Sequence, residues 1–312
     1  MQTGSANHDR ILAAAIEWAG APMAIATVVE TWKSAPCPVG THMLVHADGR
    51  FVGSVSGGCV EADVLERAQM VLAGAPAIVR RYGVADDAAW DVGLPCGGDI
   101  QVLVQPVSAD GFPESLFDDI VNARGNGATL AVVTSLATGR SMIAQDAAAE
   151  GFVNVYYPPR RLLIVGAVEI AAALSAIAVS QGIDVTLCDP RGRFLTADRF
   201  PGVRLDDRWP DEAVKAFAPD SRSAIVTLSH DPKIDDPALI SALDSLAAYV
   251  AALGSVRSHA ARLSRLSAAG VSANQTARIE GPAGVAINAI SAPEIALSIA
   301  AGMIRAFNMG LR

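Results

Sequence analysis

The chain has 312 residues, of which 51% are hydrophobic and 18% are charged. This length predicts two domains, and this composition excludes an intrinsically disordered chain. With 24 basic and 32 acidic residues, the formal net charge is −8, which disfavours a general nucleic-acid-binding surface or a basic membrane patch. The apolar runs are too short to span a membrane, and residues 1–9 lack the pattern of an export signal, so we expect a cytoplasmic protein.

The cysteines are few and widely spaced. Cys37, Cys59, Cys96 and Cys188 form no C-x-x-C pair. Their spacing fits neither a disulfide scaffold nor a standard structural zinc site, so we expect reduced thiols.

The first half of the chain has the pattern of a mixed α/β domain. Its clearest local signal is Asp48-Gly49 between two alternating apolar runs, which predicts a β-hairpin. In chain order, the patterns predict a helix over 10–20, strands over 23–31, 42–46 and 50–55, a helix over 60–73, and strands over 77–82 and 100–107.

The pattern changes at Pro158-Pro159, which can lie neither inside a helix nor in a central strand. We therefore predict an N-terminal mixed α/β domain over 1–157 and a Rossmann-like parallel-sheet domain over 158–312. The second domain is predicted to contain strands over 162–165, 184–188, 224–228 and 249–253. Its predicted helices are one that follows the first strand and ends at residue 181, and two more over 258–269 and 293–308.

The most informative motif is the run from Gly53 to Glu61, in which a strand ends at Ser56-Gly57-Gly58 and a helix begins near Cys59. Unpaired N–H groups of a Gly-Gly turn at a helix start can bind an anion. The same helix end would lower the pKa of the Cys59 thiol. The alternative interpretation is a tight turn that carries a small buried thiol.

A second cysteine stands beside a glycine pair, at Cys96-Gly97-Gly98, before the strand over 100–107. Two such turns suggest one shared site for a soft metal such as molybdenum, or for a sulfur atom in transfer. The alternative is a hairpin turn with a buried Cys96. The histidine pair His42 and His46 could complete a zinc site, but we expect both to be surface residues of the hairpin.

The second domain begins with the strand, turn and helix order of a dinucleotide-binding unit. Gly166 occupies the first glycine position, and Asp189 follows 23 residues later, near the offset of an acid that holds a ribose. Val168 replaces the second glycine, and Glu169 would repel a phosphate, so the sequence disfavours ordinary NAD(P) binding. A Rossmann sheet retained for structure remains the alternative.

The chain resembles the XdhC/CoxI family, the accessory proteins of molybdenum hydroxylases such as xanthine dehydrogenase and carbon monoxide dehydrogenase. Its matches to the family are residues 34–40, 53–61, 93–98, 194–201, 253–255 and 293–299. Many members have Gly-Ala-Gly-His in the Rossmann turn, whereas this chain has Gly166-Ala-Val-Glu169, which weighs against a nucleotide role for that turn.

The resemblance implies a chaperone that binds molybdenum cofactor, shields it while a cysteine desulfurase supplies its sulfido ligand, and inserts it into an apo molybdenum hydroxylase. The cofactor would be molybdopterin or its dinucleotide form, and the chaperone would be a homodimer without a catalytic role of its own. The expected cofactor-binding residues are Ser56, Gly57, Gly58, Cys59, Glu61, Cys96, Gly97, Gly98, Gly166 and Asp189, with Cys59 and Cys96 on the metal. The alternatives are an NAD(P)-dependent oxidoreductase and an assembly scaffold that holds no cofactor.

Overall fold

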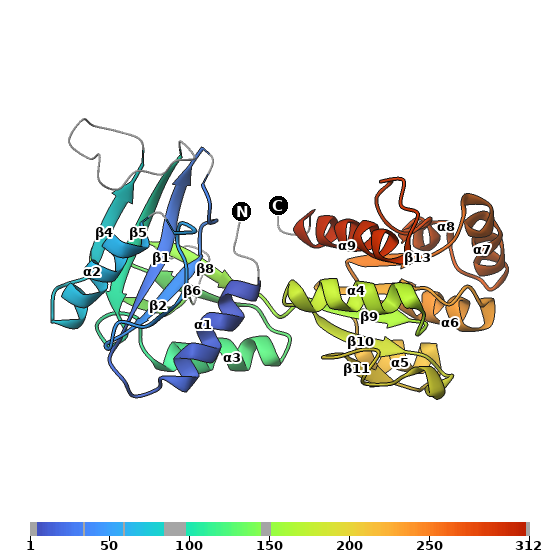
Figure 1. Ribbon diagram of the computed structural model, residues 1–312, viewed down its shortest axis with the longest axis horizontal. Helices are drawn as coiled ribbons and strands as arrows, with labels where there is room; N and C mark the ends of the chain where they lie inside the picture. The colour runs from blue at the N-terminus through green and yellow to red at the C-terminus, as the bar shows by residue number, and fades with distance from the viewer. Residues whose placement is uncertain (1–4, 34, 59, 84–97, 145–150, 310–312) are drawn as a thin grey trace. The chain divides into compact units, whose positions relative to one another are not determined.

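The structure, a computed structural model, describes residues 5–33, 35–58, 60–83, 98–144 and 151–309. The chain divides into two compact units, Met1–Pro158 and Pro159–Arg312 (Figure 1). Each unit has its own sheets and hydrophobic core, and each is described by itself.

The first unit is built on a five-stranded antiparallel sheet with the strand order β3-β2-β1-β5-β4. The strands are β1 (Met23–Trp32), β2 (His42–His46), β3 (Phe51–Gly53), β4 (Ile78–Tyr82) and β5 (Asp99–Pro106). The predicted hairpin is confirmed, because β2 pairs with β3 across the Asp48-Gly49 turn. β3 ends at Gly53, where φ is +88° and a Cβ atom would lie 2.3 Å from the His42 carbonyl oxygen, so only glycine fits.

Helix α2 (Glu61–Leu72) covers one face of this sheet, with Val64, Ala68 and Val71 packed on the inner strands. Helices α1 (Ser5–Glu17) and α3 (Ser115–Gly125) contribute to a separate core on the other face. That core also includes residues of a second sheet, which has the strand order β7-β6-β8. Its strands are β6 (Leu130–Thr134), β7 (Ser141–Ile143) and β8 (Phe152–Tyr156).

The second unit contains a parallel sheet with the strand order β11-β10-β9-β12-β13-β14. Counted within the unit, this is the 3-2-1-4-5-6 order of a Rossmann fold, which confirms the predicted fold class. The strands are β9 (Arg161–Val165), β10 (Asp184–Cys188), β11 (Arg204–Asp206), β12 (Ser223–Thr227), β13 (Tyr249–Ala252) and β14 (Ile279–Glu280).

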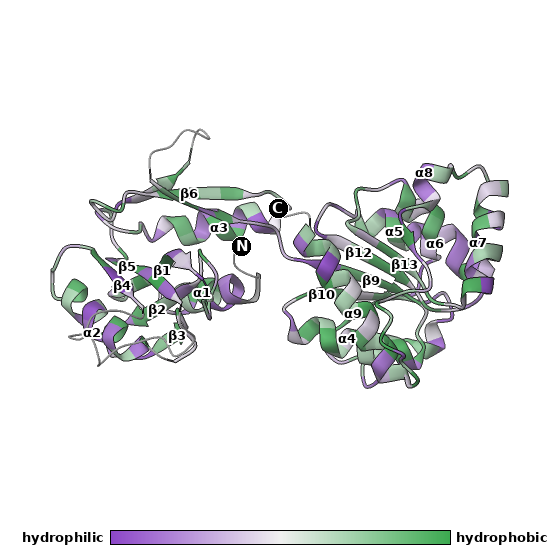
Figure 2. Ribbon diagram, turned by 90° about the horizontal axis from the view of Figure 1, so that it is seen from above, coloured by the Kyte–Doolittle hydropathy of each residue, from purple (hydrophilic) through white to green (hydrophobic). Residues whose placement is uncertain are grey.

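Helices cover both faces of the parallel sheet, so its central strands β9 and β12 are mostly apolar, with runs such as Leu162–Val165 that Figure 2 colours green. Helices α4 (Glu169–Ser180) and α9 (Ala292–Met309) pack on one face. Helices α5 (Pro210–Phe217), α6 (Pro232–Leu243) and α7 (Val256–Ala268) pack on the other. Two short elements, the 3₁₀ turn η1 (Gly192–Phe194) and helix α8 (Ala273–Thr276), lie in the connections. In the described part of the chain, every helix is too short or too polar to cross a lipid bilayer.

Candidate functional site

Three loops meet the same end of the five-stranded sheet. Because neighbouring strands are antiparallel, β1, β3 and β4 end there, while β2 and β5 begin there. Cys37 lies in the loop after β1, Cys59 in the loop after β3, and Cys96 between β4 and β5. Cys59, Cys96 and Gly97 lie outside the described residues, whereas Gly58, Val60 and Gly98, which flank these segments, are described.

The loop between β3 and α2 is organised by the side chain of Glu61. Oε1 of Glu61 accepts hydrogen bonds from Ser54 Oγ (2.5 Å), Val55 N (3.1 Å) and Ser56 N (2.9 Å). Oε2 accepts from Ser56 Oγ (2.5 Å), Gly58 N (2.9 Å) and Val60 N (3.2 Å). The loop therefore wraps around the carboxylate of Glu61, a residue that is only 8% exposed.

The charge of Glu61 is stabilised by these donors. Burial by itself raises the pKa of this carboxyl group, but the hydrogen bonds from Ser54 and Ser56 outweigh burial and lower the pKa to about 2. Glu61 is also the first residue of α2, where a negative charge interacts favourably with the helix dipole. Glu61 is thus ionised at neutral pH and acts as an internal anion for the loop.

The expectation that the Gly57 and Gly58 amides are unpaired is wrong. Gly58 N donates to Glu61, and Gly57 N donates to Ser54 Oγ at 2.8 Å. The anion that the Gly58 amide meets is a side chain of the same protein, and Ser56, 2% exposed, belongs to the same internal network. Glu61 itself faces inward, toward these donors, so its role in this structure is to position the loop.

The structure brings a further thiol, Cys37, to this loop. Cys37 is partly exposed, and its Sγ lies 3.8 Å from the Ser54 carbonyl oxygen. Burial, and then the nearby Glu61 carboxylate, raise the pKa of this thiol. Cys37 lies in the 34–40 match to the family, but its spacing from the other cysteines does not mark it as a site residue, because the contact depends on how the loop after β1 folds back toward the loop after β3.

The same end of the sheet contains a second polar cluster, on α2 and β4. Arg67 contacts Asp63 through Nε at 2.7 Å and Nη2 at 2.9 Å, and Tyr82 Oη donates to Asp63 Oδ2 at 2.6 Å. These contacts fix the start of α2 to the last residue of β4. Gly98, which precedes β5, is buried.

Metal-binding side chains do not cluster in the described part of the chain, where no group of three or more His, Cys, Asp or Glu residues could hold a metal ion. The predicted surface position of His42 is wrong. His42 is 3% exposed, and its ring lies within hydrogen-bonding distance of Thr27, Tyr156 and Asn154. Its nitrogens are therefore occupied inside the core, where burial lowers its pKa well below the usual value.

In the second unit, the predicted pair Gly166 and Asp189 meet at one turn, but their contacts are internal to the protein. Asp189 is fully buried; its Oδ2 accepts from Ala167 N at 2.8 Å, and both its oxygens contact the Arg191 guanidinium at 2.8–2.9 Å. Gly166 has φ of +107°, and a Cβ there would lie 2.8 Å from Ser229 N. The carboxylate that would hold a ribose is thus covered by Arg191, and this geometry disfavours NAD(P).

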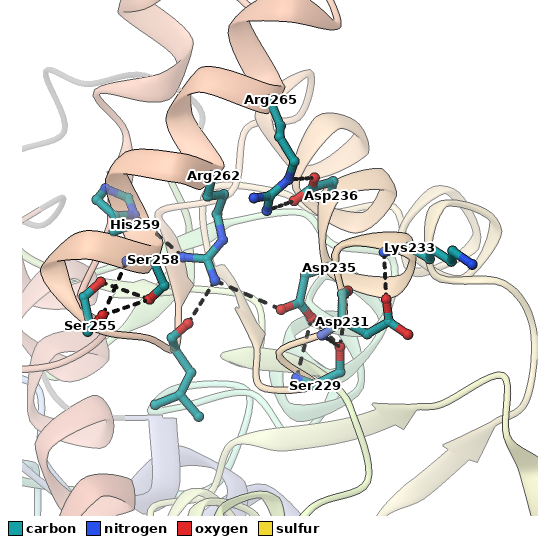
Figure 3. A network of polar contacts seen from close by, with 11 residues as sticks. Ser229, Asp231, Lys233, Asp235, Asp236, Ser255, Ser258, His259, Arg262 and Arg265 are labelled. Atoms are coloured by element: carbon teal, nitrogen blue, oxygen red, sulfur yellow. Dashed lines mark hydrogen bonds and ion pairs between the residues drawn. The ribbon is translucent and has the colours of Figure 1, made fainter.

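A buried polar network connects two further loops at the carboxyl end of the parallel sheet (Figure 3). Ser229 Oγ donates to Asp235 Oδ1 at 2.7 Å, and Arg262 donates to the Leu253 carbonyl at 2.7 Å. Arg262 and Asp235, both almost fully buried, approach to 3.9 Å, and His259 Nδ1 lies 3.5 Å from Arg262. The network holds α6 and α7 to the ends of β12 and β13.

Comparison with known families gives two matches. The model of the XdhC and CoxI family matches residues 18–83, and the model of the XdhC Rossmann domain matches residues 162–303. The chain belongs to the XdhC and CoxI family. The first match includes the loops that carry Cys37 and Cys59, and the second includes all of the parallel sheet except Arg161 at the start of β9.

Curated relatives of this XdhC and CoxI family member match almost end to end. The chain is 29% identical to the molybdenum cofactor insertion chaperone PaoD of Escherichia coli, over 95% of this chain and 87% of PaoD. It is 23% identical to a probable xanthine dehydrogenase subunit of Bacillus subtilis, over 90% of this chain and 92% of that protein.

The fold is shared with a solved structure. It is a crystal structure described as a xanthine dehydrogenase from Bacillus halodurans, with a TM-score of 0.80 and 23% sequence identity. The match covers 96% of this chain and 95% of that chain.

Proposed function

We propose that this chain is a molybdenum-cofactor chaperone, which holds the cofactor as cargo and inserts it into a xanthine-dehydrogenase-type hydroxylase. The observation that carries the proposal is the common origin of the three cysteine-bearing loops at one end of the five-stranded sheet. The relationship to PaoD, a molybdenum cofactor insertion chaperone, supports the same assignment.

The site chemistry suits molybdenum. Thiolates are the soft ligands that favour such a metal, and the chain supplies them from Cys59 and Cys96, with Cys37 beside the first loop. The Gly57 amide already donates to Ser54, and the Gly58 amide already donates to Glu61. The cofactor would therefore bind to the cysteines and to the exposed rim of the loop. Glu61 keeps that loop in one conformation before the cargo arrives, which reduces the entropic cost of binding.

The finer parts of the proposal concern partners. A chaperone of this kind protects the cofactor from solvent while a cysteine desulfurase supplies the sulfido ligand, then passes it to the apo-hydroxylase. We expect it to act as a homodimer in the cytoplasm and to catalyse no reaction of its own. The buried Asp189 and the substituted glycine turn support a structural role for the Rossmann sheet.

The test is the molybdenum and pterin content of the full chain after anaerobic purification from cells that make the cofactor. We expect the wild type to retain both, and the variant Cys59→Ala with Cys96→Ala to lose most of both. Cys188→Ala is the matched control, because Cys188 is buried in the other unit and its thiol has a pKa raised by burial to about 12. A wild type that binds its hydroxylase but never retains cofactor would instead indicate an assembly scaffold.

A further inference from the structure

An exposed arginine lies over a tryptophan ring at the end of the sheet where the cysteine loops begin. The Arg81 guanidinium is centred 4.3 Å from the Trp32 ring, and its Nη2 donates to Asp99 Oδ2 at 2.7 Å. Trp32 is the last residue of β1, Asp99 is the first of β5, and the two pair across the strands. Arg81 stands one residue before the end of β4, so three strands build this one group.

The Trp32 and Arg81 pair is on the face of the sheet away from α2. Tyr82 packs into the core beneath α2, and side chains alternate along a strand, so Arg81 projects to the opposite face. The Arg81 side chain is 59% exposed, and Trp32 is partly exposed. The pair therefore presents a guanidinium group, backed by an aromatic ring, to solvent beside the loops after β1 and before β5.

A lysine side chain stands next to this group. Lys33, which follows Trp32 directly with φ of +59°, is exposed and forms no ion pair within the described part of the chain. Arg81 is paired with Asp99, so Lys33 is the cation next to this group that has no ion-pair partner among the described residues, in a protein whose formal net charge is −8. An exposed ion pair such as Arg81 with Asp99 contributes little to stability.

We propose that Arg81, held in place by Trp32 and Asp99, is the stacking platform for the pterin ring of the cofactor. This inference rests on the proposed function and assigns the recognition of the organic part of the cargo to residues outside the cysteine loops. A planar guanidinium stacks on a fused nitrogen heterocycle, and its fixed position means that little side-chain entropy is lost on binding. Lys33 would then meet the negative phosphate of the same ligand.

The chain contains a matched control for this arrangement. At the opposite end of the sheet, Arg50 is centred 5.0 Å from the Trp18 ring and contacts Asp48 at 3.0 Å. This group has the same three residue types, but it lies at the β2–β3 turn, away from the cysteine loops. Arg50→Lys therefore reproduces the chemistry of Arg81→Lys without touching the proposed platform.

The experiment titrates the full chain with pterin-6-carboxylate and measures tryptophan fluorescence and pterin anisotropy. We expect saturable binding to the wild type, weakened about tenfold by Arg81→Lys and by Trp32→Phe, and unchanged by Arg50→Lys. Lysine retains the charge but cannot stack, so this loss would assign the effect to stacking. CMP and GMP, titrated separately, test whether a nucleotide binds the platform in place of the pterin.

Four results decide between the proposals. Equal pterin binding by the wild type and a folded Arg81→Lys variant would overturn the platform, and so would Arg81-dependent binding of CMP or GMP without pterin binding. If the wild type retains molybdenum in the same preparations, either of these two results would overturn the platform without contradicting the chaperone function. Conversely, Arg81-dependent pterin binding by a protein that never retains molybdenum would show that Arg81 binds a pterin ring, but would contradict the cofactor-holding role on which the platform rests.

Discussion

Ser56 contacts both carboxylate oxygens of Glu61: its N–H donates to Oε1 at 2.9 Å and its hydroxyl donates to Oε2 at 2.5 Å. Gly57, Gly58 and Cys59 lie between Ser56 and Glu61 in the sequence, so this double contact closes the loop that contains them. The backbone on both sides of Cys59 is therefore fixed by one ionised side chain. The consequence is that the conformation of the cysteine loop depends on Glu61, although Glu61 itself faces the interior of the loop.

Replacement of Glu61 by glutamine should weaken this loop. The glutamine NH2 group would face donors from Ser56, Gly58 or Val60, which leaves buried donors unpaired. We expect the free energy of unfolding to fall by about 2 kcal/mol and cofactor retention to drop. Urea denaturation and molybdenum analysis check this, with the exposed Glu66→Gln on the same helix as control. A Glu61→Gln protein as stable as Glu66→Gln would contradict the organising role.

Acid should destabilise the first unit through its buried histidine pair, His8 and His42. Burial lowers the pKa of His8 from 6.5 to about 4, and His8 Nε2 contacts the Gly40 carbonyl oxygen at 3.2 Å. The folded state keeps His8 neutral while the unfolded chain binds a proton below about pH 6.5, so stability falls as the pH drops from 7 toward 4. Between pH 7 and pH 5 this single group accounts for about 2 kcal/mol.

The check is denaturation of wild type and His8→Gln at both pH values. Glutamine can still donate to the Gly40 carbonyl but does not titrate. We expect the loss of stability between pH 7 and pH 5 to be smaller in His8→Gln by that amount. An identical loss in the two proteins would show that His8 is not the responsible group.

Asp189 should be structural. Asp189→Asn leaves the buried Ala167 N–H and the Arg191 guanidinium without their anion, and we expect a loss of about 3 kcal/mol in the free energy of unfolding. Asp206→Asn is the matched control, since Asp206 accepts from Arg208 across the same two-residue spacing but binds no glycine-turn amide. Losses of equal size would contradict the assignment of Asp189 to the Gly166 turn.

NADH and NADPH should not bind. Val168 replaces the glycine that permits approach of a pyrophosphate, and Arg191 covers the carboxylate that would accept the ribose hydroxyl groups. Val168→Gly alone should not create a site, because Asp189 stays covered. Titration followed by tryptophan fluorescence checks both proteins, and saturable binding to the wild type would favour the oxidoreductase alternative.

Much of the fold could be predicted because its signals are local. Asp48-Gly49 specified the hairpin, and short apolar runs separated by helical patterns specified the parallel sheet. The three-stranded sheet of β6, β7 and β8 was not predicted. Its pairing joins residues such as Thr134 and Phe152, which only the folded chain brings together, and β7 has only three residues.

The candidate site was only partly predictable for the same reason. The two Cys and Gly-Gly motifs could be found in the sequence, but the direction of the Glu61 side chain could not, since a glutamate at a helix start can point to solvent or back to the preceding turn. Cys37 and Arg81 each gain their significance from a neighbour on another strand or loop. The one local signal that could have indicated the inward direction of the Glu61 carboxylate is the position of Ser54 and Ser56 just before a glutamate at the start of a helix.

The most direct test of the shared cofactor site is whether the Cys59 and Cys96 thiols can bind one atom together. The reduced Cys37→Ser, Cys188→Ser protein is treated with phenylarsine oxide, which bridges two neighbouring thiols and then resists competition by a monothiol. The mass of the treated protein is measured by intact mass spectrometry. We predict one bound arsenic per chain, lost when either Cys59 or Cys96 is changed to alanine. A protein that binds no arsenic, or that still binds it after one of the two thiols is removed, would contradict a shared site for the cofactor.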